Sequence, residues 1–90
     1  MIVARRVYYS GTVQGVGFRY TARQIAEGFA VGGYVCNLPD GRVEVWAEGV
    51  AAEVDRFLQM VARRMAENID HQRVLDEQPE GMKGFDIRLG

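Results

Sequence analysis

Cysteine and histidine are scarce in this chain, which excludes an intramolecular disulfide and argues against a metal site. The 90 residues include one cysteine, Cys36, and one histidine, His71. A single cysteine cannot form an intramolecular disulfide, and such a chain suits a reducing compartment. His71 has no second histidine and no nearby cysteine, so it is a poor ligand site for a metal. We therefore expect a protein without a disulfide and without a bound metal.

Long apolar runs and an excess of positive charge are also missing. No uncharged stretch is long enough to span a bilayer, and the N-terminal MIVARRVYYS lacks the long apolar run of a signal peptide. With 11 basic and 12 acidic residues, the formal net charge is −1. General nucleic-acid binding needs a basic face that gains from counterion release, which this charge balance does not supply. We expect a cytoplasmic protein that binds neither nucleic acid nor a membrane.

The chain does have enough apolar side chains for one small core. Hydrophobic residues make up 48% of the sequence, which at this length suffices for a single core. No linker, repeat or low-complexity segment divides the chain. We predict one domain over residues 1–90.

Apolar periodicity predicts the secondary structure of the first half. Residues 5–13 alternate as a strand does, and from Phe18 the apolar residues follow a helical spacing: Phe18, Ala22, Ile25, Ala26 and Phe29. The pair Gly32-Gly33 then predicts a break before a short strand over 34–36. In NLPDGRVEVWAEG, Pro-Asp-Gly predicts a tight turn, followed by a strand that buries Val43, Val45 and Ala47.

The second half predicts one more helix and two strands. A helix starting near Ala51 is indicated by Val54, Phe57, Leu58, Val61 and Met65. HQRVLDE is a less clear strand, and GFDIRL is a clear one with Phe85, Ile87 and Leu89 on one side. The order β-α-β-β-α-β, with the fourth strand split or doubled, predicts an α+β, ferredoxin-like sandwich. In this fold two helices cover one face of a mostly antiparallel sheet.

The loop from Gln14 to Arg19 has the composition of an anion site. Backbone N–H groups in a tight turn containing two glycines can form a concave nest, and a following helix adds its N-terminal N–H groups and the positive end of its dipole. Gly17 lets the backbone approach a ligand closely, and the guanidinium of Arg19 can bind two phosphoryl oxygens. A plain turn with a surface arginine would give the same pattern, so the loop alone leaves both interpretations open.

Asn37 is the second candidate residue. It ends the strand that precedes the Pro-Asp-Gly turn, where the fold can bring it close to the glycine loop. Its amide offers a donor and an acceptor, which suits the orientation of a water molecule. An asparagine before a turn also often bonds its own backbone. Cys36 should face the opposite side of the strand and pack as a buried thiol.

Two segments of the chain resemble the acylphosphatase family. They are SGTVQGVGFR, residues 10–19, and GYVCNLPDGRVEVWAEG, residues 33–49, and the ending FDIRL is similar to the last strand of the family. The resemblance covers nearly the whole chain and implies an acylphosphatase-like domain over 1–90. By residue, it implies that Arg19 binds phosphate, that Asn37 orients the attacking water, and that the backbone of Gly15, Val16, Gly17, Phe18 and Arg19 forms the phosphate cradle.

The resemblance also implies the reaction. The expected substrate is a small acyl phosphate, which is hydrolysed to a carboxylate and inorganic phosphate without cofactor or metal by a monomeric enzyme. One departure from the family is Ala30, where members usually carry a glycine that ends the first helix; either Gly32 ends the helix here or the helix ends differently. The turn after the second helix also lacks the Gly-Pro that is frequent in the family.

Three other interpretations remain at this stage. Many ferredoxin-like domains bind ligands without turnover, so a phosphate- or ligand-sensing module is the main alternative. An RNA-recognition domain is suggested only by GVGFRY, which here precedes a helical period. The third is a domain from a larger carbamoyl-phosphate-using protein.

Overall fold

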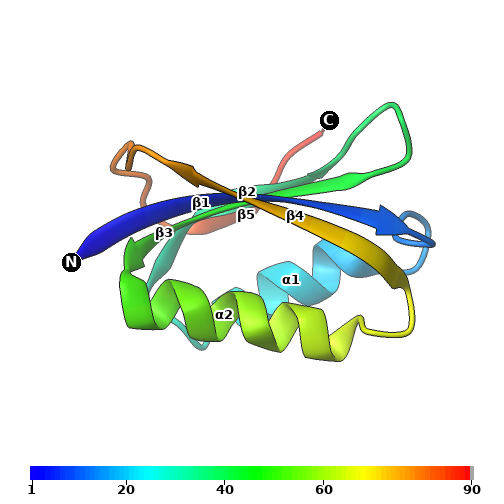
Figure 1. The fold of residues 1–90 in the computed structure, drawn as a ribbon. Helices are drawn as coiled ribbons and strands as arrows, with labels where there is room; N and C mark the ends of the chain where they lie inside the picture. Colours follow the sequence, from blue (N-terminus) through cyan, green and yellow to red (C-terminus); the bar gives the residue numbers. More distant parts are fainter. Residues whose placement is uncertain (90) are drawn as a thin grey trace.

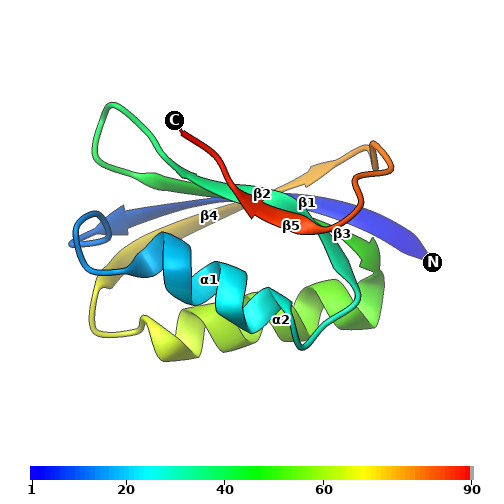
Figure 2. The ribbon, with the colours of Figure 1, turned by 180° about the vertical axis from the view of Figure 1, so that it is seen from behind.

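One five-stranded sheet and two helices make up the molecule. The computed structural model describes residues 1–89. The elements are β1 (Ile2–Gly11), α1 (Phe18–Ala26), β2 (Val31–Asn37), β3 (Val43–Val50), α2 (Ala51–Arg64), β4 (Ile69–Glu77) and β5 (Phe85–Ile87). Both helices lie on one face of the sheet (Figures 1 and 2). This arrangement confirms the predicted α+β, ferredoxin-like sandwich, in which two strands, β4 and β5, follow the second helix.

The strand order in the sheet is β4-β1-β3-β2-β5. All neighbouring pairs are antiparallel except β2 and β5, which run parallel. β3 is central and pairs with β1 on one side and with β2 on the other. β4 and β5 therefore form the two edges, and the connection 78–84 must carry the chain from one edge to the other.

The core lies between the helices and the sheet. As predicted, Val43, Val45 and Ala47 of β3 are fully buried. The helices contribute the other side: Phe18, Ala22, Ile25 and Ala26 from α1, and Val54, Phe57 and Val61 from α2. Apolar residues at helical spacing thus form one stripe on each helix, and burying both stripes against the sheet fixes the start of α1 beside the ends of β1 and β2.

The prediction that Gly32 and Gly33 break the chain before a strand is wrong. Both glycines lie inside β2, whose residues pair with β3 from Val31 to Asn37. A Cβ atom at Gly33, where φ is +147°, would overlap the carbonyl oxygen of Trp46, and one at Gly32 would overlap that of Met82. The glycines permit close approach of neighbouring backbone, which is a role that glycine also has within strands.

The end of the chain is less extended than predicted. HQRVLDE lies within β4, as predicted, but the predicted strand GFDIRL is a strand only over Phe85–Ile87. Leu89 is 94% exposed, so its predicted alternation with Phe85 and Ile87 fails. β5 pairs only with β2, at an edge of the sheet. Its inward-facing side chains, Phe85 and Ile87, already pack against the core, so Leu89 is not needed to cover it.

The first helix ends without a left-handed residue. α1 stops at Ala26, and the next residue, Glu27, has right-handed helical dihedrals. Among the described residues no non-glycine has a positive φ, so Ala30 is not strained, and neither Ala30 nor Gly32 ends the helix. Phe29 falls outside the helix but still packs against the core.

Candidate active site

The glycine loop, α1, β2 and β5 enclose a cavity of about 250 Å³. Its lining residues are Val13, Gly15, Gly17, Phe18, Arg19, Tyr20, Asn37 and Ile87. The structure therefore brings Arg19 and Asn37 to one cavity, as the sequence predicted. Of the five predicted cradle residues, Val16 alone is missing from the lining, and its side chain is exposed.

Two glycines give the loop backbone an alternating sign of φ. Gly15 and Gly17 have φ values of +77° and +81°. Val16 between them has no positive φ, because no non-glycine among residues 1–89 has one. Successive N–H groups in a tight turn that contains residues of positive φ can converge on one point and form an anion nest. A Cβ at Gly15 or Gly17 would meet nothing within 4 Å, so these positions favour glycine because of their dihedral angles and not because of crowding.

The start of α1 adds further N–H groups. Gly17 is the N-cap residue, and no side chain caps the helix. The helical hydrogen bond from Thr21 N to Gly17 O, at 2.9 Å, leaves the N–H groups before Thr21 without partners inside the helix. The first turn of α1 contains no acidic residue, so the positive end of the helix dipole is not offset by a local carboxylate.

Arg19 lies in this cavity without a carboxylate partner. Within residues 1–89, no Asp or Glu oxygen lies within 4.0 Å of its guanidinium, whereas Arg5, Arg6, Arg42 and Arg56 each form an ion pair. A guanidinium binds phosphate through a planar pair of N–H groups. The side chain is therefore available to an anion.

Asn37 reaches the cavity from the end of β2. Its Oδ1 atom is buried and accepts no hydrogen bond from any described residue. Buried side-chain oxygens usually have a partner. Because this one has none among residues 1–89, it is available to accept a hydrogen bond from a group that enters the cavity. β5 fixes the neighbouring part of β2, since Val35 pairs with Ile87 and its carbonyl accepts a hydrogen bond from Arg88 N at 2.9 Å.

Gln14 is the residue that sequence reasoning missed. Its Nε2 donates to the carbonyl oxygens of Leu38, at 2.8 Å, and of Arg42, at 2.9 Å. We call this pair of hydrogen bonds the Gln14 bridge. The acceptors are main-chain atoms 24 and 28 residues away, and no sequence pattern identifies a main-chain acceptor at that separation.

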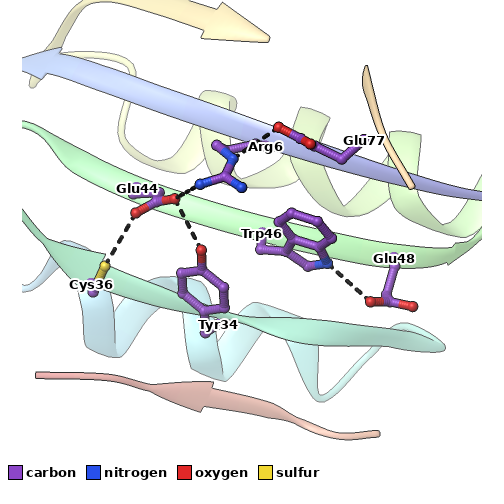
Figure 3. Close-up of polar contacts among 7 residues, drawn as sticks. All are labelled: Arg6, Tyr34, Cys36, Glu44, Trp46, Glu48 and Glu77. Atoms are coloured by element: carbon purple, nitrogen blue, oxygen red, sulfur yellow. Dashed lines mark hydrogen bonds and ion pairs between the residues drawn. The ribbon is translucent and has the colours of Figure 1, made fainter. Parts of the chain in front are cut away.

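Cys36 belongs to a different polar region. The face of the sheet opposite the helices carries an open-face network, which we define as Arg6, Tyr34, Cys36, Glu44, Trp46, Glu48 and Glu77 (Figure 3). In it the Glu44 carboxylate accepts hydrogen bonds from Arg6, at 2.7 Å, and Tyr34, at 2.9 Å. Cys36 Sγ lies 3.7 Å from the same carboxylate. Cys36 and Asn37 thus face opposite sides of β2, as predicted.

Two groups of the open-face network, Cys36 and Tyr34, are held in their protonated forms. Burial, and then the neighbouring Glu44 carboxylate, raise the pKa of the Cys36 thiol above its ordinary value. Burial and the hydrogen bond to Glu44 raise the pKa of Tyr34 to about 12. A thiol held in its protonated form is a poor nucleophile, so the network has the character of a structural cluster.

Residues 1–89 contain neither a membrane-spanning helix nor a metal-binding cluster. No helix there is long and apolar enough to cross a membrane. No group of three or more His, Cys, Asp or Glu side chains within the same residues gathers in a way that could hold a metal ion.

Comparison with known proteins identifies the family. The acylphosphatase family model matches residues 5–87. An acylphosphatase of Rubrobacter xylanophilus is 46% identical over 89 residues, covering 92% of this chain and 77% of the relative. The crystal structure of acylphosphatase from Bacillus subtilis superimposes with a TM-score of 0.85 at 32% identity, covering 98% of this chain and 99% of that one.

A part of a larger protein is also similar. Full-length HypF, solved in a phosphate- and nucleotide-bound form, matches with a TM-score of 0.80 at 28% identity, over 98% of this chain and 12% of that one. The family model, the curated relative and the B. subtilis structure agree over most of the chain, and the chain belongs to the acylphosphatase family, hydrolases that act on acyl phosphates.

Proposed function

We propose that this acylphosphatase hydrolyses its substrate by in-line attack of a water oriented by Asn37 on a phosphoryl group bound by residues 15–19 and the Arg19 guanidinium. The bond between phosphorus and the carboxylate oxygen breaks, and the products are a carboxylate and inorganic phosphate. The observation that carries the proposal is the shared cavity. In it Arg19, which has no carboxylate partner within residues 1–89, faces the same space as the buried Oδ1 of Asn37, which accepts no hydrogen bond from those residues.

Charge stabilisation is the first part of the mechanism. The transition state of phosphoryl transfer is loose, and its charge lies on the equatorial phosphoryl oxygens and on the leaving oxygen. The nest of Gly15, Val16 and Gly17, the first N–H groups of α1 and the Arg19 guanidinium are all donors fixed before the substrate arrives. Fixed donors stabilise developing charge without the cost of reorientation.

Positioning of the nucleophile is the second part. Asn37 Oδ1 can accept a hydrogen bond from a water, and this contact directs a lone pair of that water toward phosphorus. The leaving group is a carboxylate, which departs without a general acid. A phosphoryl oxygen of the substrate takes the proton from the attacking water. For that step we expect that no ionisation seen in the pH–rate profile belongs to a protein side chain. Mutation of any single titratable side chain should therefore leave the shape of the profile unchanged.

The proposal extends to the setting of the reaction. It describes residues 1–90 as a single cytoplasmic, monomeric domain that acts on a small acyl phosphate without a nucleic-acid partner, metal or cofactor. The nearly balanced charge and the single cysteine support this description.

The test is hydrolysis of benzoyl phosphate by the native protein and by Asn37→Ala, each with and without EDTA. We expect native turnover that resists the chelator, and a kcat about 100-fold lower in the variant. Inhibition by inorganic phosphate should change by less than about threefold, since the cradle and Arg19 are intact. Phosphate binding without turnover in the native protein would instead favour a sensing module.

A further inference from the structure

The Gln14 bridge joins the two halves of the proposed site. Gln14 immediately precedes the cradle, and one of its acceptors, the carbonyl of Leu38, belongs to the residue after Asn37. The donors of the phosphate site, residues 15–19, all lie on one continuous segment. Asn37 lies on another segment, and the Gln14 bridge is a direct side-chain link between the two.

The acceptors of the bridge are held firmly. Leu38 N donates to Arg42 O at 2.8 Å, and Gly41 N donates to Leu38 O at 3.1 Å, so both carbonyls belong to the closed turn between β2 and β3. Of the two ends of the Gln14 amide, only the NH2 group can donate, and it has the two N–H bonds that two carbonyl oxygens need. No other uncharged side chain of similar length presents two donors, so the geometry requires glutamine chemistry at this position.

We propose that Gln14 is a positioning residue of the reaction, whose bridge to Leu38 and Arg42 sets the distance between the bound phosphoryl group and the water held by Asn37. The inference rests on the proposed function, because it acts through Asn37. Loss of the bridge leaves the cradle and the closed β2–β3 turn each intact, but allows the two to shift relative to each other. A displacement of about 1 Å at a reacting atom can lower a rate about 100-fold.

The experiment compares Gln14→Met, which keeps the length and removes both donors, with Gln59→Met, the same change at an exposed position of α2. With benzoyl phosphate we expect kcat to fall about 10-fold to 100-fold in Gln14→Met, and the inhibition constant of inorganic phosphate to change by less than about threefold. Gln59→Met should match the native protein. Rates are measured where circular dichroism shows every variant folded, so loss of folded protein does not contribute.

A double-mutant cycle identifies the partner through which Gln14 acts. If it acts by locating Asn37, Gln14→Met should lower kcat by less than about twofold in an Asn37→Ala background. Full additivity of the two effects would overturn the proposal, as would an equal loss of kcat and phosphate affinity in Gln14→Met alone. If Asn37→Ala by itself retains the native kcat, the proposed role of Asn37 fails, and the positioning role of Gln14 fails with it.

A second variant covers the case in which Gln14→Met does not fold. Gln14→Glu keeps the shape but carries no donor when ionised and one O–H donor when protonated. Its kcat relative to the native protein should therefore rise as the pH is lowered through the pKa of the introduced carboxyl. A relative rate that stays at the native level across that range would contradict the proposal.

Discussion

Asn37 and Cys36 are neighbours in β2, but they belong to two different polar regions. In one region the charged and polar groups have partners among the described residues, and in the other they do not. On the open face, the Glu44 carboxylate has partners in Arg6 and Tyr34. In the cavity, Arg19 has no carboxylate partner within residues 1–89, and Asn37 Oδ1 accepts nothing from those residues. A paired buried group stabilises the fold, whereas an unpaired one in a cavity is a cost that a ligand can offset. The comparison distinguishes residues that stabilise the sheet from residues that are available to bind a substrate.

The largest effect expected from this comparison is on the activity of Arg19→Gln. The substitution removes the guanidinium from the cavity without breaking an ion pair, so we expect kcat/KM to fall about 100-fold to 1,000-fold. The free energy of unfolding in urea should stay within about 0.5 kcal/mol of the native value. Weaker inhibition by inorganic phosphate should accompany the loss. A variant with native phosphate affinity would show that Arg19 does not contact the phosphoryl group.

The reverse result is expected for Glu44→Gln on the open face. The Glu44 side chain is 10% exposed, and its replacement turns two charge-assisted hydrogen bonds into weaker contacts. We expect the free energy of unfolding to fall by about 2 kcal/mol, with kcat for benzoyl phosphate within about twofold of native. Urea unfolding and turnover of the same preparation provide the two values. A loss of activity without a loss of stability would show that the open-face network contributes to catalysis, although it lies on the other face of the sheet.

Glu48 predicts a dependence of stability on pH. Burial alone would raise the pKa of its carboxyl, but hydrogen bonds from the Trp46 indole, at 3.0 Å, and from the N–H groups of Glu80 and Gly81, at 3.1 and 2.8 Å, outweigh burial. The folded-state pKa therefore lies below the ordinary value of 4.5.

A lowered folded-state pKa means that this contribution is complete above the ordinary value and is lost as the pH falls through the folded value. We expect the free energy of unfolding to drop more steeply in the native protein than in Glu48→Gln between about pH 5 and pH 3. At neutral pH the variant should be less stable by about 1–2 kcal/mol. Equal slopes in the two proteins would show that Glu48 is not a source of acid sensitivity.

The smallest effect is expected for Cys36→Ala, the residue next to Asn37. The thiol packs against the open face and does not line the cavity, so kcat should remain within about twofold of native. Loss of the buried sulfur should cost about 1 kcal/mol of stability. A large fall in kcat would mean that the two faces of β2 are coupled, or that the thiol itself takes part in the reaction.

The sequence predicted the elements of this fold better than their boundaries and links. Alternation and helical spacing identified the strands, both helices and the buried face of β3, because burial on one face leaves a period in the sequence. Gly32 and Gly33 led to a wrong prediction of a break, because glycine occurs both at breaks between elements and where two backbones approach closely. Only the contacts with the backbone of Trp46 and Met82 distinguish the two cases.

The candidate site was also predicted only in part. Arg19 and Asn37 belong to recognisable segments, and the fold brings them together as expected. The Gln14 bridge was not predictable, because its partners are carbonyl groups whose approach depends on the complete β2–β3 turn. The absence of the Val16 side chain from the cavity lining follows from side-chain direction in an irregular loop, which periodicity does not describe.

The position of β2 in the sheet has a consequence for hydrogen exchange. β3 lies between two long neighbours, but one side of β2 is covered only by β5, which has three residues. Amides protected by short edge strands exchange through small local openings, and those of central strands exchange near the free energy of global unfolding. Asn37 therefore lies on the side of the sheet that opens first. On heating, the protein should lose turnover below the temperature at which it loses its helices. Exchange at Gly33 and Arg88, whose N–H groups donate to Gly84 O and Val35 O across the β2–β5 pair, should report that earlier event.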